Sequence, residues 1–206
     1  IHTPTNQWSF GRPWRMTWWL CLKTSAVTTS ELWFDQQLTP TCWVRQTLRG
    51  PMSGCYGALN LGLHVGDDPE RVAANRKRLA DDLGYPVHFV RQVHGIEVAD
   101  IHPHHHAEAV ADALVTAHPG QALAIMTADC LPIVLVAETF VGIAHGGWRG
   151  VLAGIAEATW RKMGSPVCQI WLGPCIGPDR FEVGPEVRAL FVRQHSATAD
   201  FFRPSH

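Results

Sequence analysis

The clearest hydrophobic pattern in the chain lies at residues 124–150, which read AIMTADCLPIVLVAETFVGIAHGGWRG. Apolar runs are separated by a polar break at TADC and by a short turn, and a glycine-rich segment follows the last run. This pattern predicts strand, break, strand, turn, strand and then a loop that leads into a helix. Cys130 lies in the polar break and His145 ends the last strand, so their side chains can point at one spot; whether they do, and which third group joins them, is left open by this pattern.

A second strong signal predicts a helix over residues 69–83. Asp68 is suited to cap its N-terminus, Pro69 fits its first position, and Gly84 ends it. The apolar face of this helix consists of Val72, Leu79 and Leu83. Arg76 falls on the same face. It either extends to solvent or pairs with a structural carboxylate, or it binds an anion in a cleft.

Weaker alternation of apolar and polar residues predicts extended structure elsewhere. We expect Asn60 and His64 to share one face of an extended segment over 58–65, opposite its leucines, and a hairpin over 87–101 that turns at His94. Further strands are expected at 41–47, 112–116 and 167–172, a helix over 151–163, and a last short helix from near Pro185.

The first forty residues show no regular period, because their tryptophans are scattered among Thr, Ser and Gln. We expect an irregular tryptophan-rich arm over 1–40 that packs on the core, with one strand near 16–22. A single domain should follow over 41–206. A chain of 206 residues with 46% apolar content is large enough for one compact core.

The composition of the chain limits which kinds of partner and which cellular compartment are expected. A formal net charge of −1 gives no basic field for nucleic acid. No apolar run reaches the roughly 18 residues of a membrane span, and the apolar run at 16–22 is too short to favour export. The six cysteines form no CxxC pair, which favours reduced thiols and a cytoplasmic location.

Three residues could together hold a metal ion: His94, Cys130 and His145. They are too far apart in the chain for a zinc finger, whose ligand pairs lie about two to five residues apart. Each instead comes from a separate strand end, and three protein ligands with an open fourth position are typical of catalytic zinc. Copper also accepts two histidines and one cysteine. Spacing alone leaves other combinations of His and Cys open.

Two neighbouring features could serve a reaction at such a centre. Asp129, next to Cys130, is either a general acid/base or a carboxylate that holds a turn. Gly146, Gly147 and Arg149 lie where a strand enters a helix, so they either bind phosphate at the helix start or form a tight turn in which glycine serves packing. The histidine tract HPHHH at 102–106 is interpreted as an exposed loop that can bind adventitious metal.

Several long motifs in this chain resemble those of one known family. In chain order they are LNLGLHVGDDPERVAANRKRL, RQVHG, ADALVT, TADCLPIVL, AHGGWRG, WLGPCIGP and FEVGPEV. Together they cover about residues 50–202 and are similar to the multicopper polyphenol oxidoreductase (laccase) domain family, whose members are also described as purine nucleoside phosphorylases.

The resemblance implies a fold and a set of site residues. The expected fold is a single α/β domain, a layered sandwich of mixed sheets flanked by helices, like the catalytic domain of cytotoxic necrotizing factor. The implied metal ligands are His94 in RQVHG, Cys130 in TADC and His145 in AHGGWRG. Asn60, Arg76 and Arg149 also match motif positions and are expected to line the cleft.

The chain departs from the family pattern before the LNLG motif. The family's arginine position falls near Thr47, and Arg45 and Arg49 lie two positions away on either side. Whether Arg49 takes over its role stays open.

These residues and the family resemblance are compatible with three functions. The first is a zinc-dependent purine nucleoside phosphorylase, with adenosine deaminase activity at the same site. Here Cys130, Asp129 and Arg76 would be catalytic, and Asn60, Arg149, Gly146, Gly147 and Arg49 would hold nucleoside or phosphate. The second is a copper-dependent polyphenol oxidase that acts on phenolic substrates. The third is a non-catalytic metal-binding module.

Overall fold

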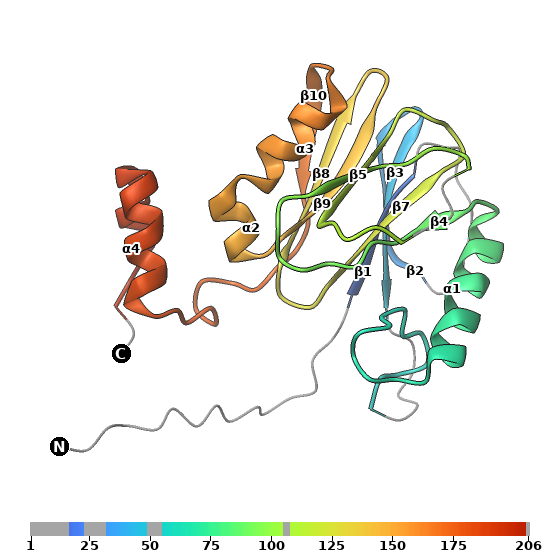
Figure 1. The fold of residues 1–206 in the computed structure, drawn as a ribbon, viewed down its shortest axis with the longest axis horizontal. Coiled ribbons are helices and arrows are strands. Elements are labelled where there is room, and N and C mark those ends of the chain that lie inside the picture. Colours follow the sequence, from blue (N-terminus) through green and yellow to red (C-terminus); the bar gives the residue numbers. More distant parts are fainter. Residues whose placement is uncertain (1–16, 23–31, 49–54, 105–107, 205–206) are drawn as a thin grey trace.

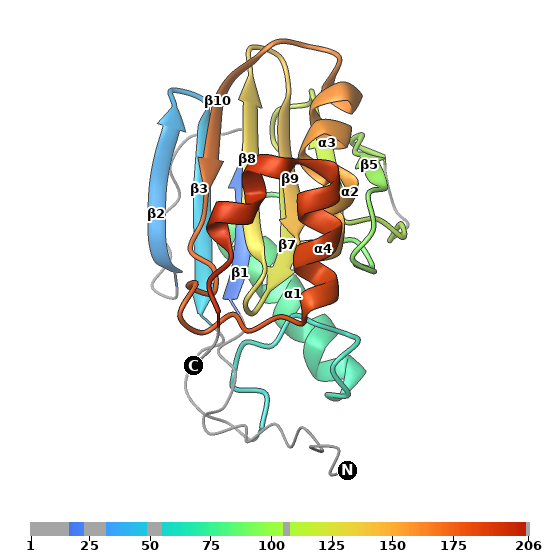
Figure 2. The same cartoon turned by 90° about the vertical axis from the view of Figure 1, so that its left-hand side faces the viewer.

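The protein is a layered α/β sandwich in which two five-stranded mixed sheets pack face to face between helices (Figure 1). The computed structural model describes residues 17–22, 32–48, 55–104 and 108–204. The first sheet has the order β2-β3-β1-β7-β4 and the second β10-β8-β9-β6-β5. Figure 2 shows α4 in front of the second sheet and α1 behind the first. The layered sandwich of mixed sheets expected from the sequence is thereby confirmed.

The strands of both sheets are short. The first sheet contains β1 (Thr17–Leu22), β2 (Leu32–Thr39), β3 (Cys42–Leu48), β4 (Val87–His88) and β7 (Ala122–Thr127). The second contains β5 (Val98–Asp100), β6 (Ala113–Thr116), β8 (Leu131–Ala137), β9 (Val141–Gly146) and β10 (Val167–Leu172). The helices are α1 (Pro69–Leu83), α2 (Trp148–Ala153), α3 (Ile155–Met163), α4 (Pro185–Gln194) and a final 3₁₀ helix (Ser196–Phe201).

Strand alternation explains the four layers. In β7, Leu123 and Ile125 face the core between the two sheets, whereas the intervening residues face α1. In β8, Val134 and Val136 enter the same central core, and Ile133 and its alternate neighbours pack against α3. Because successive side chains point to opposite faces, a continuous apolar run supplies two cores at once.

The helix α1 begins and ends where its sequence predicts. The Asp68 side chain accepts a hydrogen bond from the Glu70 backbone N–H at 3.0 Å, and Pro69 is its first residue. Gly84 ends the helix with a φ of +70°, a conformation that glycine adopts without strain. The predicted apolar face is buried against the first sheet.

The hairpin predicted over 87–101 is wrong. β4 pairs in parallel with β7 in the first sheet, and β5 pairs in parallel with β6 in the second, so this segment crosses between sheets. Long-range partners take up its hydrogen-bonding groups. The Gln92 side chain exchanges two hydrogen bonds with the backbone of Met126, and Asp112 accepts the N–H groups around His94.

Two other expectations need correction. Residues 58–65 form turns and irregular structure rather than an extended segment, and Asn60 is buried while His64 is exposed. The helix expected over 151–163 begins earlier, at Trp148, and is divided by Gly154 at a φ of +92°. The periodicity of apolar residues does not reveal this break. The left-handed conformation of Gly154 leaves the spacing of apolar residues along the chain nearly unchanged.

Most of the other predicted elements are confirmed. The strands near 41–47, 112–116 and 167–172, the three strands of 124–150 and the last helix from Pro185 are confirmed. The strand near 16–22 is also confirmed as β1, but the irregular arm missed β2. Within the part of the chain that the structure describes, no helix combines the length and apolarity needed to cross a bilayer.

Candidate metal centre

Three loops and strand ends bring His94, Cys130 and His145 together. Their candidate ligand atoms all lie within 4.8 Å of one another. The Cys130 Sγ is 4.0 Å from the His94 Nε2, and the two imidazole rings meet edge to face with centroids 4.7 Å apart. Burial increases from the exposed His94 through Cys130 to the buried His145. Strand register explains part of the meeting: Leu131, which follows Cys130, pairs with Gly146, which follows His145.

A buried carboxylate, Asp112, organises the centre. It is fully buried and accepts backbone N–H groups from Val93, His94 and Gly95 at 3.1, 2.9 and 2.7 Å. Its Oδ1 also lies 2.9 Å from the Nδ1 of His145. The Asp112 side chain therefore fixes both the loop that carries His94 and the orientation of the His145 ring. A carboxylate that orients a ligand histidine through its second nitrogen is a common feature of metal sites.

The sequence pattern predicts Asp112 only as the first residue of the strand at 112–116. A signal was present, since this acidic residue directly precedes the wholly apolar stretch Ala113–Val115. A carboxylate carried into a core by such a strand needs partners to offset its desolvation. The register Ala113↔Ala144 then places it beside His145, which no local pattern reveals.

The charge state of the pair follows from these contacts. Burial alone would lower the pKa of His145, but hydrogen bonds to Asp112 and Cys130 and the charges of both outweigh it and raise this pKa to about 9. Burial likewise opposes ionisation of Asp112, but hydrogen bonds from His145 and three backbone N–H groups lower its pKa. The metal-free centre thus holds an ion pair of histidinium and carboxylate.

His94 differs from His145. Burial and the nearby positive charge of His145 lower its pKa, so its imidazole is neutral at physiological pH and ready to bind a metal. Its backbone has a φ of +61°, the only positive value at a non-glycine residue among the described residues. The left-handed conformation costs free energy that Asp112 offsets through its hydrogen bonds to this loop.

Glycine at position 147 is what leaves the centre open. A Cβ there would lie 2.6 Å from the His94 Cδ2 and 3.4 Å from the Cys130 Sγ. With two imidazoles and one thiolate converging beside this space, the residues present fit a zinc or copper ion.

We expect Gly147→Ala to weaken zinc binding at least about tenfold, because the added methyl group must displace the His94 ring. Competition with a chromogenic chelator measures the affinity. Gly177→Ala is the control, since a Cβ there meets no atom within 4 Å. Equal zinc affinity in both variants would contradict this account of Gly147.

The raised pKa of His145 predicts opposite effects of pH on stability and on metal affinity. Its ion pair stabilises the metal-free protein fully below about pH 6.5, and this contribution is lost as pH rises through about 9. Zinc requires the neutral imidazole, so its affinity should rise over the same range. Urea unfolding and zinc titration between pH 6 and 10 test both trends. His145→Gln should remove this component of the stability profile; an unchanged profile would refute the assignment.

Asp129 and Arg149 lie close to the centre. Asp129 directly precedes Cys130, is half-buried, and has its pKa raised by burial. Arg149 is exposed, stacks on Trp148 with its guanidinium 4.3 Å from the ring centroid, and its charge helps to lower the pKa of His94. A half-buried carboxyl group with a raised pKa and an exposed cation therefore flank the candidate ligands.

The structure gives Arg76 and Asn60 extensive structural contacts. The Arg76 Nε donates to the Leu61 carbonyl at 2.8 Å, its Nη1 pairs with Glu108 at 3.2 Å, and its guanidinium covers Phe89. The buried Asn60 holds its own loop through Gly62 and Asp67. These contacts correspond to the structural alternative for Arg76, and a catalytic role for it stays a prediction. Arg49 lies outside the described residues.

The glycine-rich turn contributes packing more than a helix dipole. A Cβ at Gly146 would meet the Leu131 carbonyl at 2.8 Å, and one at Gly150 the Gly95 carbonyl at 3.0 Å. The helix that follows, α2, has only six residues, so its dipole is small. The start of α2 by itself therefore offers little attraction for an anion.

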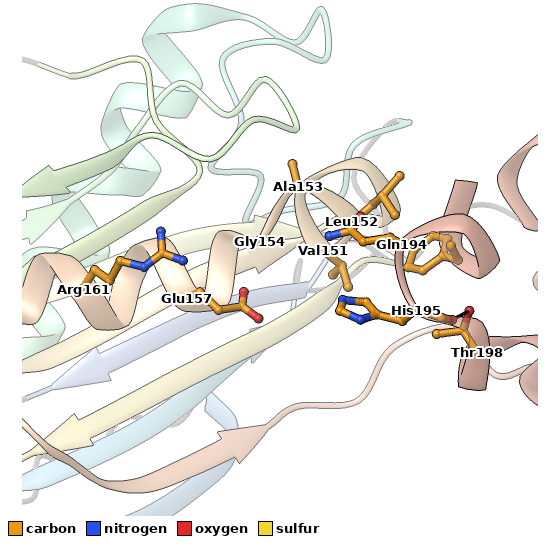
Figure 3. Close-up of a pocket in the computed structure, with 10 residues that line it drawn as sticks. Val151, Leu152, Ala153, Gly154, Glu157, Arg161, Gln194, His195 and Thr198 are labelled. Atoms are coloured by element: carbon orange, nitrogen blue, oxygen red, sulfur yellow. Dashed lines mark hydrogen bonds between the residues drawn. The ribbon is translucent and has the colours of Figure 1, made fainter. Parts of the chain in front are cut away.

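A separate open pocket of about 420 Å³ lies between the α2–α3 pair and the end of α4. Figure 3 shows Glu157 on α3 pointing toward His195, and Arg161 and Thr198 also line the pocket. None of the three candidate metal ligands lines this pocket.

The fold and the cluster define a class of protein: an α/β sandwich domain with a three-ligand candidate metal centre at the ends of its strands. Residues 41–206 match the family model described as multi-copper polyphenol oxidoreductase laccase. The chain therefore belongs to this family, as its motifs indicate.

Curated relatives carry a different functional name. The chain is 46% identical over 154 residues to a purine nucleoside phosphorylase of Pseudomonas aeruginosa, covering 73% of this chain and 63% of the relative. It is 46% identical over 143 residues to the purine nucleoside phosphorylase YfiH of Escherichia coli, covering 66% and 59%. The chain thus spans about three fifths of the length of these relatives.

Solved structures share the fold. A Neisseria meningitidis protein, NMB0706, superposes with a TM-score of 0.72 at 36% identity, covering 78% of this chain and 69% of that one. YlmD from Geobacillus stearothermophilus gives a TM-score of 0.58 at 36% identity, covering 66% and 57%.

Proposed function

We propose that this chain is a metal-dependent purine nucleoside phosphorylase, which converts adenosine or inosine and phosphate to the free base and ribose 1-phosphate. The observation that carries the proposal is the convergence of His94, Cys130 and His145 within 4.8 Å. Relatives at 46% identity that bear the name purine nucleoside phosphorylase support it. Three protein ligands, rather than the four usual at structural zinc, favour a catalytic centre over a non-catalytic binding module.

The reaction requires an anion to be held against the sugar and a proton to reach the departing base. A phosphate oxygen forms a bond to the ribose C1′ while the bond from C1′ to the purine nitrogen breaks, and the electron pair leaves with the base. Arg149 would hold the phosphate, and its electrostatic effect on the pKa of His94 supports this role. Asp129, whose pKa is raised by burial, is suited to donate the proton that the purine takes up.

The metal adds Lewis acidity: when bound, zinc polarises an oxygen of a substrate or acidifies a water molecule. The chain's own contribution is to fix the ligand geometry. Asp112 holds His94 and His145 through hydrogen bonds of 2.9 Å, and Gly147 keeps space beside the ligands.

The same arrangement supports adenosine deamination as a second activity. In that reaction water replaces the exocyclic amino group at C6, and inosine and ammonia are formed. Asp129 would move the proton from the attacking water to the departing nitrogen. This activity needs no phosphate, so it should survive a change of Arg149.

A copper-dependent polyphenol oxidase is the second candidate, favoured by the description of the family model. Two histidines and a cysteine accept copper as well as zinc. The experiment is to prepare metal-free protein, restore zinc or copper separately, and assay adenosine with phosphate beside a phenolic substrate. Ribose 1-phosphate formed with zinc supports the phosphorylase; phenol oxidation that requires copper, with nucleosides untouched, would refute it.

Replacing Arg149 by alanine should raise the KM for phosphate about 10- to 100-fold and leave the KM for nucleoside nearly unchanged, since a charge-assisted contact to the anion is lost. Steady-state kinetics with each substrate varied in turn measure the two constants. Arg161→Ala is the matched control, because this arginine lies on α3 at the separate pocket. Equal effects on both KM values would argue against a phosphate role.

A further inference from the structure

A pair of histidines lies outside the candidate metal centre and is not used by the proposed reaction. His102 follows β5 and His118 follows β6, the neighbouring parallel strand. The His102 Nδ1 and the His118 Nε2 are 3.2 Å apart, and the rings meet edge to face with centroids 5.4 Å apart. We propose that these two nitrogens form a second metal site, which takes a divalent transition ion, Cu²⁺ above all.

The spacing of the two nitrogens suits a shared ion. Imidazole nitrogens bind zinc or copper at about 2.0–2.1 Å, so two of them at neighbouring positions of one ion lie roughly 3 Å apart. The observed 3.2 Å falls in that range. Without an ion, the same distance allows a single hydrogen bond between the rings. Binding would therefore replace one shared proton by a cation at nearly the same separation of the two nitrogens.

The backbone beneath the pair is fixed by one buried hydroxyl. The fully buried Thr116 donates from its Oγ1 to the Ile101 carbonyl at 2.7 Å and accepts the His118 N–H at 3.1 Å. The Ile101 N–H in turn donates to the Val115 carbonyl at 2.9 Å. The residue before His102 and the backbone of His118 are thus tied to the same atom, so the backbone positions that carry the two rings are fixed relative to each other.

A carboxylate lies on the far side of the His102 ring. The Asp100 Oδ1 is 3.8 Å from the His102 Nε2, the nitrogen that does not face His118. At this distance the carboxylate does not accept a hydrogen bond from the ring, but its negative charge favours a cation bound at the pair. Lys162, 3.9 Å from the other oxygen of Asp100, offsets part of that charge. Because His102 is exposed, the remaining positions on the ion are open to water.

This site is distinct from the cluster of His94, Cys130 and His145. Asp112, which organises that cluster, precedes β6, whereas His118 follows it. Asp112 and Thr116 are four residues apart along extended chain, which spans on the order of 13 Å. Cu²⁺ is favoured here because nitrogen ligands bind it more tightly than the other divalent ions of the first transition series. The proposal does not depend on the phosphorylase reaction.

The test is a Cu²⁺ titration of the whole chain with its cysteine-containing centre already loaded with zinc. We expect one further equivalent of Cu²⁺, with two nitrogen ligands in its electron paramagnetic resonance spectrum. His102→Gln and His118→Gln should each weaken this binding at least about tenfold and leave nucleoside turnover unchanged. The matched control is a variant with His104, His105 and His106 all changed to glutamine, which should retain the site.

Three results would overturn the proposal. One is that the zinc-loaded protein binds no equivalent of Cu²⁺, which would leave the contact between His102 and His118 as a hydrogen bond only. The next is unchanged Cu²⁺ affinity in His118→Gln. The third is loss of binding only when residues 104–106 are changed, which would assign the copper to that histidine tract as an adventitious ion only.

The positioning role of Thr116 gives an independent measurement. Thr116→Val removes both hydrogen bonds at nearly constant volume and should weaken Cu²⁺ binding about tenfold, whereas Thr116→Ser keeps the hydroxyl and should restore it. Thermal melts identify any general loss of stability. A merely structural threonine would alter the melting temperature without the difference in copper affinity between valine and serine.

Discussion

Replacing Cys130 by alanine is expected to abolish nucleoside phosphorolysis and tight zinc binding together. The Cys130 thiol is one of three candidate ligands in the cluster that the described residues form. The two histidines that remain cannot hold the ion in the geometry that the reaction needs. We expect turnover to fall at least about a thousandfold, which corresponds to ~4 kcal/mol of lost transition-state stabilisation. Single-turnover assays and metal analysis of the purified variant measure the two effects.

Stability should change little in this variant, because Cys130 is only half-buried at the end of a strand. Cys55→Ala is the matched control, since its thiol is exposed and belongs to no cluster of candidate ligands among the described residues. Full activity in Cys130→Ala would discard the cluster as the catalytic centre. A loss of activity in both variants would point instead to general damage by loss of a thiol.

Replacing Asp112 by asparagine should have the largest effect on stability. The carboxylate accepts hydrogen bonds from the backbone N–H groups of Val93, His94 and Gly95. An asparagine amide keeps only one acceptor oxygen, and its NH₂ group would face N–H donors that it cannot satisfy. It also removes the negative charge that pairs with His145. Disruption of a buried ion pair of this kind costs about 3–5 kcal/mol. Urea unfolding of the metal-free protein measures the loss.

Zinc affinity should fall as well, by about 10- to 100-fold, because the orientation of two ligands is lost with their shared acceptor. Asp129→Asn is the matched control: its carboxylate is half-buried and burial raises its pKa, so a neutral side chain is tolerated there. That variant should fold with nearly unchanged stability. Equal stability of wild type and Asp112→Asn would show that the hydrogen bonds around Asp112 contribute little.

The sequence by itself determined the local elements and the identity of the reactive side chains. Asp68, Pro69 and Gly84 set the bounds of α1, because capping and backbone preferences act within a few residues. Apolar runs located β7, β8 and β9. The long motifs around Cys130 and His145 pointed to the family, which the comparison confirms.

The tertiary structure decided which distant groups meet. Asp112 lies beside His145 because β6 pairs with β9. The segment around His94 crosses between the sheets, and its backbone N–H groups donate hydrogen bonds to the Asp112 carboxylate. In the same way, parallel pairing of β5 with β6 brought His102 to His118. Such contacts depend on strand order and register, which are set by the packing of all four layers at once and leave no mark in the local pattern of any one segment.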